Sequence, residues 1–181
     1  MTATVLKIMR MGQPILLEEA AVVKDPTAPE IHQLVADMRA TVESLSSTGL
    51  AAPQVDVSKR VILFRILKPT DKTLYKLSPE HDPDGVPLTA YINPVVEPLT
   101  DEMELSWEAC LSLPGLMGKV SRYTSVRFTW QTLEGKTETR EAHGFHARVI
   151  QHECDHLDGI LYPMRMTDFK DFGFIDEIVG D

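Results

Sequence analysis

Residues 151–157 read Gln-His-Glu-Cys-Asp-His-Leu and contain the pattern H-E-x-x-H. We expect this stretch to lie on a helix over residues 146–157, which Gly159 would end. Residues four apart lie one above the other on a helix, so the imidazoles of His152 and His156 can reach one metal ion. The glutamate after the first histidine can then act as general base. The structural alternative is a surface helix with two solvated histidines.

The hydrophobic pattern around this helix predicts a second helix and several strands. Apolar residues at three- and four-residue spacing predict a long amphipathic helix over residues 29–45. Apolar and β-branched runs predict strands over 61–66 and 90–96. Alternation in 125–131, followed by 137–142, predicts a hairpin. Because strands and helices do not alternate regularly, we expect an α+β fold. Mixed or antiparallel β-sheets would pack around a central metal-binding helix, with the long helix near the N-terminus.

Composition and charge limit the classes of protein. The 181 residues are 43% hydrophobic and 25% charged, which excludes a disordered chain and predicts one domain over residues 1–181. The 18 Lys and Arg against 27 Asp and Glu give a net charge of −9, which argues against stable nucleic-acid or membrane binding. The first residues carry no signal-peptide pattern, and the longest apolar run is far below the roughly 20 residues that cross a bilayer. We therefore expect a cytoplasmic protein.

A catalytic metal site of this kind needs a third protein ligand, and spacing alone leaves its position open. In the metzincin pattern the ligand would be a histidine where this chain has Tyr162. In thermolysin-like peptidases a later helix supplies a glutamate, which here would be Glu177. The upstream candidate is Cys110. The other cysteine, Cys154, lies two positions after His152 and points away from the metal face, so we expect it to pack in the interior.

Three motifs in order along the chain carry a resemblance to a known family. Residues 47–54 read STGLAAPQ where the family has G-x-G-L-A-A-P-Q, and residues 108–112 read EACLS where it has E-G-C-L-S. The third motif, Q-H-E-x-D-H-L, is complete in residues 151–157. With the opening MGQPIL of residues 11–16, the likeness extends to about Arg165. The chain resembles the peptide deformylases, which remove the N-formyl group from nascent polypeptides.

The resemblance implies a metal-dependent hydrolase that releases formate from N-terminal formylmethionine. It implies that Cys110, His152 and His156 bind one divalent metal ion, natively Fe²⁺, which Ni²⁺, Co²⁺ or Zn²⁺ can replace; ligand type alone does not name the metal. Glu153 would take a proton from the attacking water and later deliver one to the departing amine. The partners would be N-formyl-Met nascent peptides, met transiently at the ribosome. Monomer and homodimer both remain open.

Other residues would complete the site. The Gln54 side-chain amide and the Leu111 backbone N–H would stabilise negative charge on the formyl oxygen. Gly49 would let the backbone pass close to the substrate, where a Cβ would intrude. Val149, one turn before the first histidine, is our candidate wall of an apolar pocket for methionine. Arg148 lies on the same side, where it would cover the pocket edge or reach solvent.

Two departures from the motifs keep other functions open. Ser47 and Ala109 replace glycines, and if Ala109 required a positive φ, its Cβ would cost of order 1 kcal/mol and could shift Cys110. One alternative function is a gluzincin-like metallopeptidase with Glu177 as third ligand. The other is a weakly active or non-catalytic deformylase-like protein that binds N-terminal peptides. Residues 169–181 could form a strand, a short helix or a self-association surface.

Overall fold

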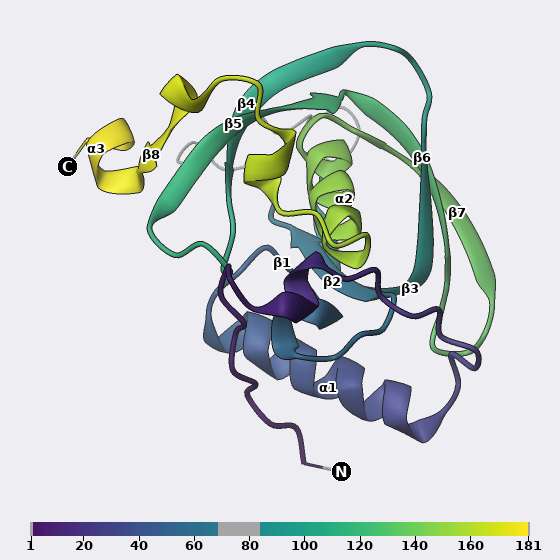
Figure 1. The fold of residues 1–181 in the computed structure, drawn as a ribbon. Helices are drawn as coiled ribbons and strands as arrows, with labels where there is room; N and C mark the ends of the chain where they lie inside the picture. Colours follow the sequence, from purple (N-terminus) through teal and green to yellow (C-terminus); the bar gives the residue numbers. More distant parts are fainter. Residues whose placement is uncertain (1, 69–83, 181) are drawn as a thin grey trace.

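Two antiparallel β-sheets surround one helix in this fold (Figure 1). The computed structural model describes residues 2–68 and 84–180. The first sheet has five strands, in the order β1 (Gly49–Ala51), β2 (Val61–Ile66), β3 (Val86–Pro98), β6 (Ser125–Gln131) and β7 (Thr137–His143). The second sheet has three, in the order β4 (Met103–Ala109), β5 (Leu116–Tyr123) and β8 (Phe172–Phe174). Every pairing between these strands is antiparallel, which confirms the predicted α+β class with antiparallel sheets.

Helix α2 (Gly144–Leu157) runs through the middle of the molecule, with strands of both sheets beside it (Figure 1). Helix α1 (Pro29–Ser44) lies outside, against β1 and β2. Gly159 follows the end of α2 with a φ of +70°, and a Cβ there would lie 2.6 Å from the Leu17 backbone. A glycine is therefore required where the chain leaves α2, as the sequence predicted.

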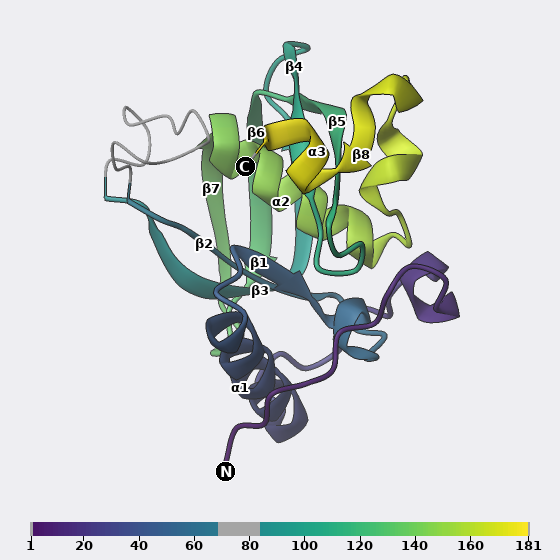
Figure 2. The same cartoon turned by 90° about the vertical axis from the view of Figure 1, so that its left-hand side faces the viewer.

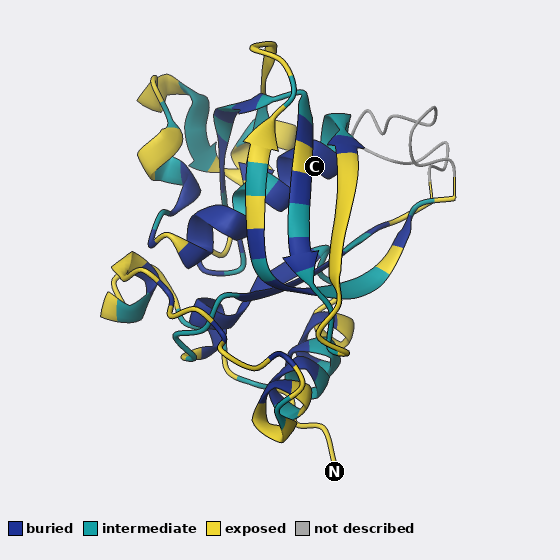
Figure 3. Ribbon diagram, turned by 90° about the vertical axis from the view of Figure 1, so that its right-hand side faces the viewer, coloured by how far each residue is buried: buried dark blue, intermediate teal, exposed yellow. Residues whose placement is uncertain are grey.

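Strand β2 is buried on both faces and so connects two apolar clusters. Its residues Ile62 and Phe64 pack in the cluster between the first sheet and α2. The alternate residues Val61 and Leu63 pack in a second cluster with the apolar face of α1. Successive side chains of a strand point to opposite faces, which explains why both faces of this strand are apolar except at the partly buried Arg65. Strand β7, at the sheet edge, is exposed along most of its length (Figure 3).

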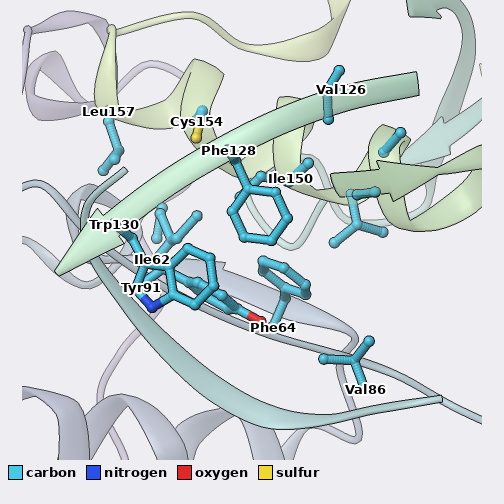
Figure 4. Packing of buried hydrophobic residues seen from close by; sticks show 14 of the residues in the cluster. Ile62, Phe64, Val86, Tyr91, Val126, Phe128, Trp130, Ile150, Cys154 and Leu157 are labelled. Atoms are coloured by element: carbon cyan, nitrogen blue, oxygen red, sulfur yellow. The ribbon is translucent and has the colours of Figure 1, made fainter. Parts of the chain in front are cut away.

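Aromatic rings fill the cluster between the first sheet and α2 (Figure 4). The rings of Phe64 and Tyr91 stack with centroids 4.3 Å apart, and those of Phe128 and Trp130 with centroids 4.8 Å apart. Cys154 lies in the same cluster, where burial raises the pKa of its thiol. The prediction that this cysteine packs in the interior is confirmed.

The two long strands of the second sheet, β4 and β5, were not indicated by sequence patterns, whereas a strand or short helix in residues 169–181 was among the expectations. Strand β8 pairs with β5 and leads into the short helix α3 (Ile175–Val179), beside the second sheet (Figure 2). Residues 169–180 thus form a 3₁₀-helical turn (Phe169–Asp171), strand β8 and helix α3, and strand β8 adds to the second sheet. Within residues 2–68 and 84–180, none of the helices has the length and apolar character needed to cross a lipid bilayer.

Candidate active site

Three side chains that could bind a metal ion meet where the end of β4 approaches α2. Cys110 directly follows β4, while His152 and His156 lie one helical turn apart on α2. The ligand atoms of the three side chains all lie within 4.8 Å of one another, and Sγ of Cys110 is 3.3 Å from Nε2 of His156. In the part of the chain that the structure describes, Glu177 is exposed on α3 and outside this cluster. Of the candidate third ligands, the structure therefore brings Cys110 to the two histidines.

The charge state of Cys110 suits a metal ligand. Burial raises the pKa of its thiol, but positive charge on His156 and hydrogen bonds from both histidines lower it by more. These effects together hold the pKa of the Cys110 thiol well below its usual value, which favours the thiolate form. His156 is buried, and its Nδ1 has no hydrogen-bond partner among the described residues. One thiolate with two imidazoles is a donor set suited to iron, zinc or nickel.

Glu108 connects to the first histidine of the cluster, and its role was missed in the sequence although it lies in the second motif. Nδ1 of His152 donates to Oε2 of Glu108 at 2.8 Å, which leaves Nε2 free to bind a metal. Arg122 holds the same carboxylate with Nε and Nη2 at 2.9 and 3.0 Å. Burial raises the pKa of Glu108, but the hydrogen bonds and charges of these two partners lower it well below normal. The group therefore stays a carboxylate that orients the imidazole.

Glu153 follows His152 on α2 and, unlike the ion-paired Glu108, lies in a site without a charged hydrogen-bond partner for its Oε2 among the described residues. Its side chain is buried, and Oε2 has no hydrogen-bond partner among the described residues. Burial raises the pKa of this carboxyl to about 7, so it can both hold and release a proton near neutral pH. A Cβ at position 49 would lie 2.8 Å from Cδ of Glu153. Gly49 is thus needed to make room for the carboxylate itself, a reason that differs from the one expected from the sequence.

The side chain of Gln54 is held in one orientation. Its Oε1 accepts the backbone N–H of Ala51 at 2.9 Å. Its Nε2 donates to Sγ of Cys110 at 3.3 Å and to Oγ of Ser112 at 3.1 Å. Since one end is anchored on the backbone, the amide N–H groups point toward the metal-ligand cluster.

A cavity of about 460 Å³ opens beside the cluster. Gly49, Gln54, Glu153 and Val149 line it, as do residues that were not expected, among them Phe145, Trp107 and Ile175 of α3. Leu111 lines the same cavity.

The two departures from the family motifs are accommodated without strain. Ala109 and Ser47 both have negative φ values, since neither is among the described residues with positive φ. The condition under which the alanine would strain the backbone and shift Cys110 is therefore not met: Ala109 ends strand β4 in ordinary extended backbone.

A family model of polypeptide deformylase matches residues 5–172 of this chain. The chain belongs to the polypeptide deformylase family. It is 45% identical to peptide deformylase 1 of Nitrosomonas europaea, over 94% of this chain and 93% of that protein. It is 47% identical to peptide deformylase 2 of Ralstonia nicotianae, over 93% of this chain and 91% of that protein.

Solved structures show the same fold. A class I type b peptide deformylase from Acinetobacter baumannii superposes with a TM-score of 0.78 at 34% identity, over 91% of this chain and all (100%) of that one. The deformylase of Ehrlichia chaffeensis in complex with actinonin superposes with a TM-score of 0.79 at 30% identity, over 93% of this chain and 92% of that one. Membership in this family confirms the predicted function, hydrolysis of the N-formyl group of polypeptides, over a gluzincin-like peptidase.

Proposed function

We propose that Cys110, His152 and His156 hold one divalent metal ion, natively Fe²⁺, with α2 as the central metal-binding helix of a single catalytic domain over residues 1–181. The observation that carries the proposal is the convergence of these three donors with the Glu153 carboxylate beside one cavity. The family match over residues 5–172 supports the single domain. When bound, the cation supplies a Lewis acid that polarises the formyl carbonyl and acidifies the attacking water.

Glu153 manages the protons of the reaction. Its pKa near 7 lets it take a proton from the water that attacks the formyl carbon. As the bond between that carbon and the amide nitrogen breaks, the same carboxyl returns the proton to the departing amine. The products are formate and a free N-terminus.

The formyl oxygen gains negative charge as water adds, and this chain offers two donors for it. Nε2 of Gln54 is aimed at the metal-ligand cluster by the anchored Oε1. The second donor is the backbone N–H of Leu111, directly after Cys110. One such donor contributes about 3 kcal/mol to lowering the barrier.

The substrate is an N-formyl-Met peptide. Val149 and Phe145 give the cavity an apolar wall for the methionine side chain, and the Glu153 carboxylate packed against Gly49 limits the room for acyl groups larger than formyl. A deformylase from Acinetobacter baumannii, 34% identical to this chain, has been solved with Met-Ala-Ser bound. We place the reaction in the cytoplasm, on nascent chains met transiently at the ribosome. The net charge of −9 favours a brief encounter over stable binding to RNA, by a monomer or homodimer.

The test is formate release from formyl-Met-Ala-Ser by protein purified without oxygen, with its metal content measured in the same sample. We expect turnover with about one iron per chain. Iron-loaded protein that binds the peptide but releases no formate would instead support a non-catalytic peptide-binding protein.

A further inference from the structure

Arg148 lies on α2 one turn before His152 and is 5% exposed. Of the two positions considered from the sequence, the structure supports the one at the pocket, since Arg148 lines the cavity. The other is wrong, because the side chain is buried and does not reach solvent. A buried guanidinium is costly unless its donors are satisfied, so its partners indicate what it does.

The guanidinium of Arg148 reaches across to the hairpin of β4 and β5. Nη2 donates to the carbonyl of Glu104 at 2.6 Å, and Nη1 to the carbonyl of Val120 at 2.8 Å. Nη1 also lies 2.8 Å from Oε1 of Glu108 and 3.5 Å from the carbonyl of Ser106. One side chain thus ties α2 to both strands of the hairpin and to the carboxylate that orients His152.

A second link joins the same helix and hairpin farther along α2. Nη1 of Arg122, on β5, lies 2.5 Å from Oδ2 of Asp155. Arg148 and Asp155 lie four residues before and three residues after His152. The two links therefore bracket that ligand, and together they restrict both the tilt of α2 and its distance from the hairpin.

The ligands of the metal site are divided between the two parts that Arg148 connects. The hairpin strand β4 leads directly into Cys110, while α2 carries both histidines. The distance between α2 and the hairpin decides whether the thiolate and the imidazoles can bind one ion. Metal–ligand distances tolerate deviations of only about 0.2 Å.

We propose that Arg148 is a positioning residue for the metal site: it holds α2 at the distance from the β4–β5 hairpin at which Cys110, His152 and His156 bind one ion. The inference rests on the metal site proposed above. Lysine would keep the charge, but its single ammonium cannot reach Glu108 and the carbonyls of both strands with the planar fork that arginine provides.

The test replaces Arg148 and measures how firmly the site holds Co²⁺. Wild type, R148M, R148K and the control R127M are loaded with Co²⁺, and release to EDTA is followed by the loss of the cobalt–thiolate absorption. R148M keeps a long apolar stem, and R127M removes a half-exposed arginine whose partner is Glu141. We expect release to be about 10-fold faster or more in R148M, intermediate in R148K and unchanged in R127M, with an altered absorption spectrum in both Arg148 variants.

The remaining outcomes also decide the question. Release and spectrum equal to wild type in folded R148M would overturn the role of Arg148. If R148M does not fold, R148K decides on the same measurements, and failure of both to fold would overturn the assignment in favour of a general structural role. Wild-type protein that takes up no Co²⁺ would overturn the proposed metal site itself, an outcome that differs from failure of Arg148 alone.

Discussion

The carboxylate of Glu153 occupies the space that any side chain at Gly49 would need. In G49A the new Cβ would lie 2.8 Å from Cδ of Glu153, closer than a normal contact, so the carboxylate must move. Displacement of a catalytic group by about 1 Å can cost about 100-fold in rate. We expect G49A to bind metal like wild type but to release formate at least about 10-fold more slowly.

The control for this substitution is G173A. A Cβ at Gly173 would meet only Ile178, at an ordinary distance of 3.4 Å. Its rate should equal that of wild type. A wild-type rate in G49A, at equal metal content, would show that Glu153 need not stay where the structure places it.

Replacement of Glu153 separates proton transfer from metal binding. In E153Q the side chain keeps its size but can no longer accept a proton, so formate release should fall by about 100-fold or more. Metal content, measured on the same samples, should be unchanged because Glu153 is outside the ligand cluster. Substantial turnover in E153Q would assign the proton transfer to another group.

Loss of the charge on Glu108 should affect both stability and metal binding. E108Q leaves Arg122 and Arg148 buried without their shared carboxylate, which is expected to cost about 3 kcal/mol in the free energy of unfolding. Metal affinity should fall about 10- to 100-fold, because the amide orients His152 less firmly than the carboxylate does. Urea unfolding and Co²⁺ titration measure the two effects.

The matched control for E108Q is E141Q. Glu141 pairs with Arg127 at 2.9 Å, but both side chains are about half exposed, at 50% and 49%. Loss of such a surface pair changes the free energy of unfolding by about 0.5 kcal/mol at most. Equal effects of the two substitutions would contradict a special role for the buried carboxylate.

Metal removal should reveal a difference between the two cysteines. The pKa of Cys110 lies below the usual value and that of Cys154 above it, so only Cys110 is a thiolate near neutral pH. After chelation, iodoacetamide should label Cys110 well before Cys154, and bound metal should slow this labelling. Peptide mass spectrometry reports the order, and faster labelling of Cys154 would contradict it.

The third ligand is tested by metal stoichiometry. C110A should bind less than about 0.1 metal ion per chain because one of three ligands is lost. E177A should bind as much metal as wild type, since Glu177 is exposed and outside the cluster. The reverse result would restore the peptidase-like ligand set.

Periodicity made the strongly patterned elements predictable from sequence. Strand β2 was expected over its observed residues because it is almost fully buried, and β6 because its buried side chains alternate with more exposed ones. The exposed strand β7 was found to within one residue because it follows β6 across a short turn. Strand β4 was missed because its first three residues, Met103 to Leu105, are all exposed, so the strand shows no alternation of buried and exposed side chains there. In β3, Pro94 lies where the register shifts between Ile92 and Val95, so the strand continues past the proline.

Contacts between residues far apart in the sequence could not be predicted from local sequence patterns either. Motif resemblance placed Cys110 with the histidines, but no local pattern pairs Glu108 with Arg148, 40 residues away. The backbone φ of Ala109 could not be predicted for a related reason. Whether a position needs a glycine depends on its backbone angles, and those of Ala109 are set by pairing of β4 with β5.

The double burial of β2 has a consequence for how this protein can change by mutation. Removal of one residue from the strand would turn Ile62 and Phe64 toward α1, and Val61 and Leu63 toward α2, because side chains alternate. A single deletion would then place the wrong side chains in both apolar clusters. The six residues of β2 therefore constrain both apolar clusters at once. The cluster with α1 is remote from the chemistry, yet it cannot change its strand register without also disturbing the cluster that packs against the catalytic helix.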